Sequence, residues 1–195
     1  RTGSHNVIIG RRNNFSSYGG LCLGYNNAIT GVYSSVTGGT NCQATGSYSS
    51  VAGGSYNIAS ATNSTCVGGG YNRASNTNAT VAGGNRCVAS GQYSSVAGGT
   101  FCTATASYSA AFGGSRVKAS ASRSVAVGGS SNEAIAEYAT AVGGSSNRAG
   151  TAANSGRYSV VVGGNNGTTT SGSNNVVVGG SGLTETITYN VTLGP

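Results

Sequence analysis

The chain repeats one short phrase at a nearly constant interval. "YSSVAGG" occupies residues 48–54 and again 93–99, and variants such as "YSSVTGG" (33–39) and "RSVAVGG" (123–129) surround them. The first glycine of each phrase serves as a marker. It falls at positions 10, 24, 38, 53, 68, 83, 98, 113, 128, 143, 163 and 179. Twelve markers, mostly 15 residues apart, are typical of a solenoid in which each repeat stacks on the next.

Two positions of the repeat are consistently apolar. Two residues before the marker stand Ile8, Cys22, Val36, Val51, Cys66, Val81, Val96, Ala111, Ala126, Ala141, Val161 and Val177. Six residues after it stand Ala44, Ala59, Ala74, Ala89, Ala104, Ala119, Ala134 and Ala149. Small and β-branched residues in fixed columns predict buried ladders. We therefore expect Val36, Val51, Val81, Val96, Val161 and Val177 to pack in the core or between chains.

A β-coil fits the repeat better than a helix does. Two glycines per unit would cost a helix about 2 kcal/mol against two alanines, whereas short β-branched runs with glycine and asparagine suit strands and turns. We predict about 12 coils, each with two short strands, over residues 1–181. The runs "VVVGG" (160–164 and 176–180) are apolar on both strand faces. One face can line the coil, and the other predicts packing of identical chains around an axis.

Three segments depart from the regular interval. The 20-residue step predicts an insertion at 150–158, and the 16-residue step predicts a second irregular loop at 165–173. After Gly182, Leu183, Ile187, Tyr189, Val191 and Leu193 alternate with polar residues. This alternation predicts a half-buried strand in a separate segment, 182–195, that joins or caps the next module.

Residues "SVAVGG" (124–129), "SSNEA" (130–134) and "TGSYSSVAGGSYNIAS" (45–60) resemble the YadA-like head repeats of trimeric autotransporter adhesins. The resemblance covers about residues 3–181. It implies a homotrimeric, left-handed parallel β-roll that attaches to extracellular matrix or host surfaces, and similar repeats occur in phage and viral fibres. The interval here is mostly 15 rather than near 14, and the five cysteines are unusual for such secreted adhesins.

The cysteines occupy ladder positions. Cys22 and Cys66 stand two before the marker, and Cys42, Cys87 and Cys102 stand four after it. We interpret them as small buried hydrophobic residues, although adjacent coils bring Cys87 and Cys102 near enough to pair in principle. Free thiols favour assembly in a reducing cytosol. They favour a phage or viral fibre over a bacterial adhesin.

Two sets of side chains are candidates for glycan or receptor binding. The first is a tyrosine ridge five residues before the marker: Tyr33, Tyr48, Tyr93, Tyr108, Tyr138 and Tyr158. The second is a basic edge formed by Arg73, Arg86, Arg116, Lys118 and Arg148. Tyrosine offers a sugar both a flat face and a hydroxyl, and basic residues attract acidic or sulfated glycans. Alternatively, the rings cover turns or the seam between chains, and the charges maintain solubility.

Other functions have little support in the sequence. There are only three carboxylates, Glu133, Glu137 and Glu185, and no aspartate, so the acidic pair of a glycosidase is not evident. We expect no catalytic residue, no cofactor and no metal site, since a lone His5 lies far from any cysteine pair. No apolar stretch approaches the length of a membrane span. The basic charge is sparse, so we do not expect nucleic-acid binding.

These observations predict a non-enzymatic, homotrimeric fibre or attachment segment, with a viral or phage tail fibre as the first interpretation. It would be a rigid shaft and a glycan-binding or host-surface head on a virion or cell surface, joined to adjacent fibre modules. A bacterial adhesin head that binds host matrix is the alternative. A polysaccharide-acting enzyme on a β-solenoid scaffold is the second alternative.

Overall fold

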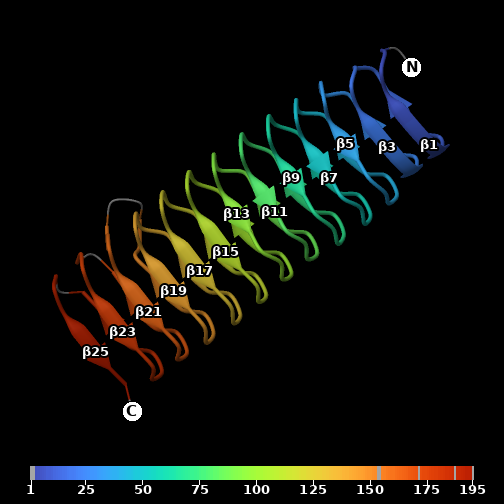
Figure 1. Cartoon of the computed structure of the whole chain (residues 1–195). Coiled ribbons are helices and arrows are strands. Elements are labelled where there is room, and N and C mark those ends of the chain that lie inside the picture. Colours follow the sequence, from blue (N-terminus) through green and yellow to red (C-terminus); the bar gives the residue numbers. More distant parts are fainter. Residues whose placement is uncertain (1–2, 153–154, 171, 187, 195) are drawn as a thin grey trace. The chain divides into compact units, whose positions relative to one another are not determined.

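The chain is an all-β, parallel β-solenoid of about 12 turns (Figure 1). The computed structural model describes residues 3–152, 155–170, 172–186 and 188–194, and these ranges contain no helix. The chain divides into two compact units, residues 1–98 and residues 99–195. We call them the N-terminal unit and the C-terminal unit. In each unit one strand of every coil joins sheet A and the other joins sheet B.

The N-terminal unit has the shorter strands in most of its coils. Its sheet A contains, in order, β1 (Val7–Arg11), β3 (Leu21–Tyr25), β5 (Ser35–Val36), β7 (Ser50–Val51), β9 (Thr65–Cys66), β11 (Thr80–Val81) and β13 (Ser95–Val96). Its sheet B contains β2 (Asn14–Phe15), β4 (Ala28–Ile29), β6 (Gln43–Ala44), β8 (Ile58–Ala59), β10 (Arg73–Ala74) and β12 (Val88–Ala89). Neighbouring strands are parallel and in register, as in Val36 opposite Val51.

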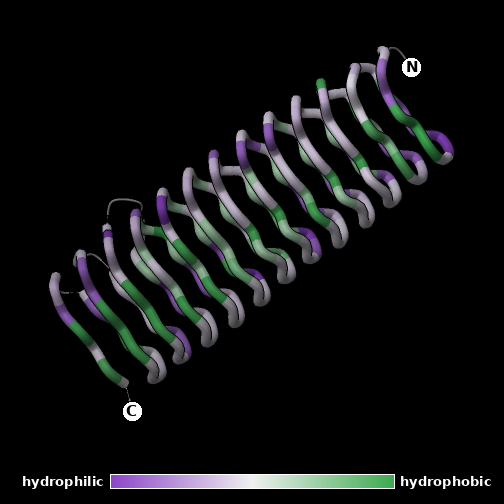
Figure 2. Tube along the Cα trace, in the orientation of Figure 1, coloured by the Kyte–Doolittle hydropathy of each residue, from purple (hydrophilic) through white to green (hydrophobic). Residues whose placement is uncertain are grey.

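The C-terminal unit follows the same plan. Its sheet A contains β15 (Ala110–Phe112), β17 (Val125–Val127), β19 (Thr140–Val142), β21 (Val160–Val162), β23 (Val176–Val178) and β25 (Val191–Leu193). Its sheet B contains β14 (Thr103–Ala104), β16 (Lys118–Ala119), β18 (Glu133–Ala134), β20 (Arg148–Ala149), β22 (Thr168–Thr169) and β24 (Thr184–Glu185). Figure 2 shows that the apolar positions recur at the same place in successive coils.

The interior of each coil is filled by one residue from each sheet. The six predicted core valines are fully buried within the single chain, as is every member of the alanine column from Ala44 to Ala149. Parallel strands stack about 4.8 Å apart, so like residues form continuous ladders. These valines therefore pack in the interior of their own coil, which is one of the two places expected for them.

Two corners in each coil have left-handed backbone. At the first, five residues before the marker, Tyr48 has a φ of 58°, and at the second, three after it, Tyr56 has a φ of 56°. The second glycine of each pair is required by close packing. A Cβ at Gly69 would lie 2.0 Å from the carbonyl oxygen of Gly84, whereas a Cβ at Gly68 would meet nothing within 4 Å. The marker glycine is thus the less restricted of the two.

The three irregular segments fit the solenoid differently from expectation. Residues 183–194 form two short strands, β24 and β25, which pair with β22 and β23. The prediction of one continuous strand leaving the roll is therefore wrong, because a left-handed corner at Tyr189 divides it. Ile187 lies outside the described residues. Residues 165–173 are not merely a loop, since Thr168 and Thr169 form β22.

The insertion lies between β20 and β21. Val160 pairs with Thr140 across the 20-residue step, so the ladder resumes in register after the extra residues. Ala152 and Ser155 form an antiparallel bridge within the insertion.

Candidate binding surfaces

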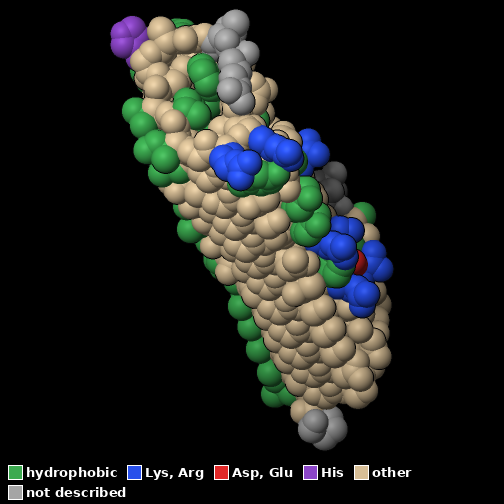
Figure 3. All heavy atoms as spheres, turned by 90° about the vertical axis from the view of Figure 1, so that its right-hand side faces the viewer, with side chains coloured by type: hydrophobic (Ala, Val, Ile, Leu, Met, Phe, Trp, Pro, Cys, Tyr) green, Lys and Arg blue, Asp and Glu red, His purple; other side chains and the backbone are tan. Residues whose placement is uncertain are grey.

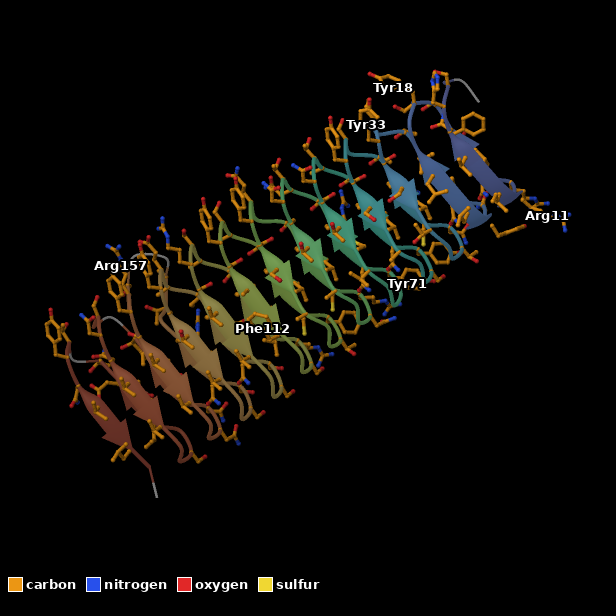
Figure 4. The ribbon with its side chains drawn as sticks, in the orientation of Figure 1. Arg11, Tyr18, Tyr33, Tyr71, Phe112 and Arg157 are labelled. Carbon is orange, nitrogen blue, oxygen red and sulfur yellow. The ribbon has the colours of Figure 1, made fainter. Side chains whose placement is uncertain are left out.

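The tyrosine ridge lies at the first corner, and its side chains are exposed except for that of Tyr138, which is half-buried; Figure 4 labels Tyr33 of this ridge. The coil spacing brings successive rings into contact. Tyr33 and Tyr48 stack with centroids 5.4 Å apart, and Tyr138 and Tyr158 stack at 4.7 Å with planes 11° apart. These stacks use ring faces that a sugar would otherwise contact. The hydroxyl groups and the outer faces at each end of a stack remain, so glycan binding by the ridge stays a prediction.

Arginine continues the ridge in the C-terminal unit. The Arg123 guanidinium lies 5.6 Å from the ring centroid of Tyr108 and 5.2 Å from that of Tyr138. Its Nη1 is also 3.4 Å from Glu137. Glu137 accepts a closer contact, at 2.7 Å, from Arg157 of the following coil. Glu137 therefore balances part of the positive charge at this exposed corner.

The predicted basic edge separates into two kinds of position. Arg86 and Arg116 occupy the second corner with left-handed backbone, whereas Arg73, Lys118 and Arg148 lie on the outer face of sheet B. Arg148 is 3.9 Å from Glu133 of the neighbouring coil. The five residues therefore do not form one continuous edge. Figure 3 shows Lys and Arg gathered in small groups on a surface that is mostly uncharged.

The second corner carries aromatic residues that the sequence reasoning missed. Tyr56 and Tyr71 stack at 4.8 Å with planes only 6° apart, and the Arg86 guanidinium lies 5.7 Å from the Tyr71 ring. Figure 4 shows Tyr71 and Arg11 on the edge of the coils opposite Tyr18 and Tyr33. An alignment of the repeats at the third residue after the marker would reveal this column.

Buried asparagines connect the coils beside the second corner. In Asn57, Nδ2 donates to the carbonyl oxygens of Gly53 (2.7 Å) and Gly69 (3.0 Å), and Oδ1 accepts from the backbone N–H of Asn72 (3.0 Å). Asn13, Asn27, Asn132 and Asn147 make equivalent contacts. These amides satisfy backbone groups at the glycine turns. Their role is structural.

All five cysteines are buried thiols outside any disulfide. Cys42, Cys87 and Cys102 replace asparagine in the ladder, and their sulfur atoms contact the same turn carbonyls, such as Cys102 Sγ with Gly113 O at 3.1 Å. Burial raises the pKa of the Cys66 thiol to about 12 and that of Cys22 to about 11. Protonated, enclosed thiols of this kind are poor nucleophiles.

A polar hollow of about 330 Å³ lies on the N-terminal unit, over the outer face of sheet B. Residues of the sheet face and of the second corner line it: Arg12, Asn14, Asn26, Asn27, Ala28, Asn41, Gln43 and Tyr56. None of these was a predicted binding residue. The size of the hollow is at the lower end of the range for small-molecule sites.

The outer face of sheet A carries no charge at the two positions that stand one and three residues before the marker, although β1 ends at the charged Arg11. From β15 to β25 these positions are apolar except for Thr140, whereas in the coils of β5, β7, β9, β11 and β13 they are serine, threonine and alanine, with Val67 as the one exception. Phe112 is 39% exposed on β15, and Val191 and Leu193 are 61% and 71% exposed on β25. In Figure 4 the Phe112 side chain projects from the face of its strand.

Catalytic or metal-binding clusters are not found in the part of the chain that the structure describes. Glu133 and Glu137 are engaged by arginines, and Glu185 is buried against Asn190 and Thr192. No three His, Cys, Asp or Glu side chains among the described residues could hold a metal ion together. The described ranges also hold no helix long and apolar enough to cross a membrane.

The sequence was compared with known protein families and with curated proteins. Neither the models of known protein families nor the curated proteins give a match to the chain.

Proposed function

We propose that the chain is a non-enzymatic, homotrimeric segment of a viral or phage fibre, a rigid shaft that also attaches to host-surface glycans. The observation that carries the proposal is the outer face of sheet A. Each coil already encloses its own core, yet in the C-terminal unit this second face leaves Phe112 and Val162 exposed and Val127 and Val142 half-buried. A contiguous apolar face on an otherwise polar surface marks an interaction site.

Other copies of the same chain are the partners that suit this face. Side chains on this face repeat once per coil. A partner must therefore offer an uncharged surface whose side-chain rows have the same spacing. A second copy meets both conditions, and the charged residues at the corners and on sheet B stay outside the contact. Threefold association, left-handed coiling and kinship with the YadA-like head belong to this proposal.

The viral version is favoured by the reduced state of the five cysteines, which are buried and outside any disulfide. Thiols in this state suit folding in a reducing cytosol before release to the virion surface. A bacterial adhesin head is the alternative, and it rests on the sequence resemblance. A polysaccharide-acting enzyme lacks an available pair of carboxylates, since Glu133 and Glu137 pair with arginines.

A glycan array tests the attachment function. The full chain is expected to bind a subset of cell-surface glycans, and the same glycans incubated with it in solution are expected to release no new reducing ends. The variant Tyr48→Ala measures the contribution of the ridge. An array without hits would reduce the role to that of a shaft, and released reducing ends would contradict the non-enzymatic proposal.

A further inference from the structure

The hollow on the N-terminal unit arises from one small residue on the outer face of sheet B. Asn14, Ala28 and Gln43 are consecutive register partners on β2, β4 and β6. The side chain of Ala28 ends at Cβ, while those of its two neighbours extend outward. A depression therefore forms over β4, and Asn26, Asn41 and Tyr56 of the second corner border it.

We propose that this hollow binds an anionic saccharide residue, that is, a sugar carrying a carboxylate or a sulfate. The proposal deepens the attachment function proposed above and rests on it. Side-chain amides dominate the lining, and an amide offers both donors and acceptors, as a sugar hydroxyl does. Asn26 donates from Nδ2 to Asn41 Oδ1, whereas Asn14 and Gln43 are exposed and make no side-chain hydrogen bond to another described residue, so these two amides are available to a ligand.

Tyr56 provides a flat apolar wall. One face of its ring is stacked on Tyr71, with the planes 6° apart. The other face is therefore turned to the preceding coil, where Asn41 occupies the same corner and also lines the hollow. The ring is 46% exposed. An accessible aromatic face can pack against the C–H side of a sugar ring.

Arg12 gives the hollow its preference for an anion. Its Nη1 donates to the Tyr25 hydroxyl at 2.7 Å, and the guanidinium lies 5.6 Å from the Tyr25 ring centroid. These contacts hold the guanidinium in place, and its other N–H groups remain for a ligand. Residues 1–98 contain five arginines and no Asp or Glu, so no carboxylate of this unit neutralises Arg12. Charge-assisted contacts from arginine to carboxylate or sulfate are among the strongest hydrogen bonds.

The same balance of groups argues against a nucleic acid. Binding along a phosphate backbone requires a cation for nearly every phosphate. The hollow has a single guanidinium among five uncharged amides, which suits one anionic group with several hydroxyls around it.

Titration of the full chain with three matched oligosaccharides tests the proposal: one ending in glucuronic acid, its neutral glucose counterpart, and its sulfated counterpart. Ala28→Phe fills the hollow, and Val88→Phe is the control on the same outer face of sheet B, on β12 away from the hollow. Arg12→Gln removes the charge, and Arg73→Gln is its control on β10. Thermal melting of each variant verifies folding.

We expect wild type to prefer an anionic oligosaccharide to the neutral one. Loss of a charge-assisted contact in Arg12→Gln should weaken anionic binding about tenfold and erase that preference. Ala28→Phe should weaken binding of all three sugars at least about tenfold, because it occupies the space of the sugar ring. The controls should bind as wild type does. A stronger response to the carboxylate or to the sulfate identifies which anion is the natural group.

Three results would overturn the proposal. The first is equal binding by Ala28→Phe and Val88→Phe, and the second is loss of the anionic preference in Arg73→Gln but not in Arg12→Gln. The third is no binding of any of the three sugars by wild type. None of these would refute the attachment function if the glycan array gives hits that depend on Tyr48, so the two failures are distinguishable.

Discussion

The two units of the chain use the same repeat with different backbone at the marker glycine. In the C-terminal unit, β15, β17, β19, β21 and β23 have three residues each, and from Gly128 onward the marker amide joins the ladder, as in Gly128 N–H to Phe112 O at 2.7 Å. In the N-terminal unit, β5, β7, β9, β11 and β13 have two residues each, and the marker amides Gly53, Gly68, Gly83 and Gly98 make no such bond to a described residue. Gly128 has a φ of 63°, whereas Gly53 has a φ of 155°.

The residue before the marker accounts for this difference. It is valine or phenylalanine in those five C-terminal strands, and these residues favour extended structure. It is Thr37, Ala52, Val67, Ala82 and Ala97 in the coils of the two-residue strands β5 to β13, whereas Ile9 and Leu23 occupy it in the five-residue strands β1 and β3. Val67 alone does not extend β9, because its neighbours in the ladder are alanines. Strand length is thus set by several adjacent coils together, not by one residue.

Charge also distinguishes the units. Each has five basic residues, but all three glutamates lie in the C-terminal unit, giving formal charges of +5 and +2, which sum to the +7 of the chain. The C-terminal arginines Arg123, Arg148 and Arg157 form ion pairs. The interior ladders are the same in both units although the surface charges differ. The core columns therefore define the coil, and the outer positions can vary to suit association with other chains or ligand binding.

The largest expected effect is the loss of stability when the second glycine of a pair is replaced, because both units need this glycine, whereas the marker glycine differs between them. Gly69→Ala and Gly144→Ala should prevent folding in either unit, because a Cβ would overlap the carbonyl oxygen of Gly84 or Gly164 at 2.0 and 2.2 Å. Gly143→Ala should cost about 1–2 kcal/mol for its left-handed φ alone. Gly68→Ala, with neither problem, should cost least. Chemical denaturation measures all four, and equal losses at Gly68 and Gly69 would contradict the packing.

Charges on the outer face of sheet A should disrupt association most in the C-terminal unit. Val127→Glu with Val162→Glu places two carboxylates in the proposed contact, where desolvation would cost several kcal/mol. Light scattering should then report single chains. Ala52→Glu with Ala82→Glu should weaken the trimer less, because that part of the face is less apolar. Thr103→Glu with Thr168→Glu, on sheet B of the C-terminal unit, is the control and should remain trimeric.

Alkaline pH should affect the N-terminal unit, which holds four of the five cysteines. An unfolded thiol ionises near 9.0, whereas the buried Cys66 thiol ionises near 12. Above pH 9 the unfolded chain loses a proton that the folded chain keeps. The contribution of Cys66 to the free energy of unfolding is therefore fully present below pH 9 and decreases as the pH rises toward 12. Between pH 8 and pH 10.5 the melting temperature of Cys66→Ala should fall less than that of wild type. Identical slopes would count against a buried, neutral thiol.

The smallest effect concerns the residue before the marker. Ala82→Val with Ala97→Val would give the N-terminal unit three consecutive valines, counting Val67, and should extend its strands for a gain of about 0.5 kcal/mol. Hydrogen exchange at the amides of Gly83 and Gly98 should slow. The reciprocal change, Val142→Ala, should speed exchange at Gly163, whose N–H donates to the carbonyl oxygen of residue 142 at 2.7 Å. Unchanged exchange in both would refute the proposed cause of strand length.

The sequence alone predicts the repeating part of the fold well. A fixed interval places Val36 over Val51 and Ala44 over Ala59, so the two interior columns follow from spacing alone. The first corner follows equally from the position of Tyr33 and Tyr48. The short strands after Gly182 were missed because alternation over a few residues does not reveal a corner at Tyr189.

The candidate sites were less predictable, because they depend on differences between neighbouring coils. The hollow exists only because Ala28 stands between two longer side chains and beside Arg12 and Tyr56. The contact of Glu137 with Arg157 spans the 20-residue step, which a constant interval cannot anticipate. Stacking also consumes ring faces of the tyrosine ridge, an outcome of coil spacing that residue type alone does not show.

Sedimentation equilibrium of the wild-type chain tests the proposed threefold contact through sheet A most directly. We expect one species with three times the mass of the chain, unchanged over a wide range of protein concentration, because the proposed contact would repeat along the apolar coils of sheet A. A stable single chain at micromolar concentration would contradict it.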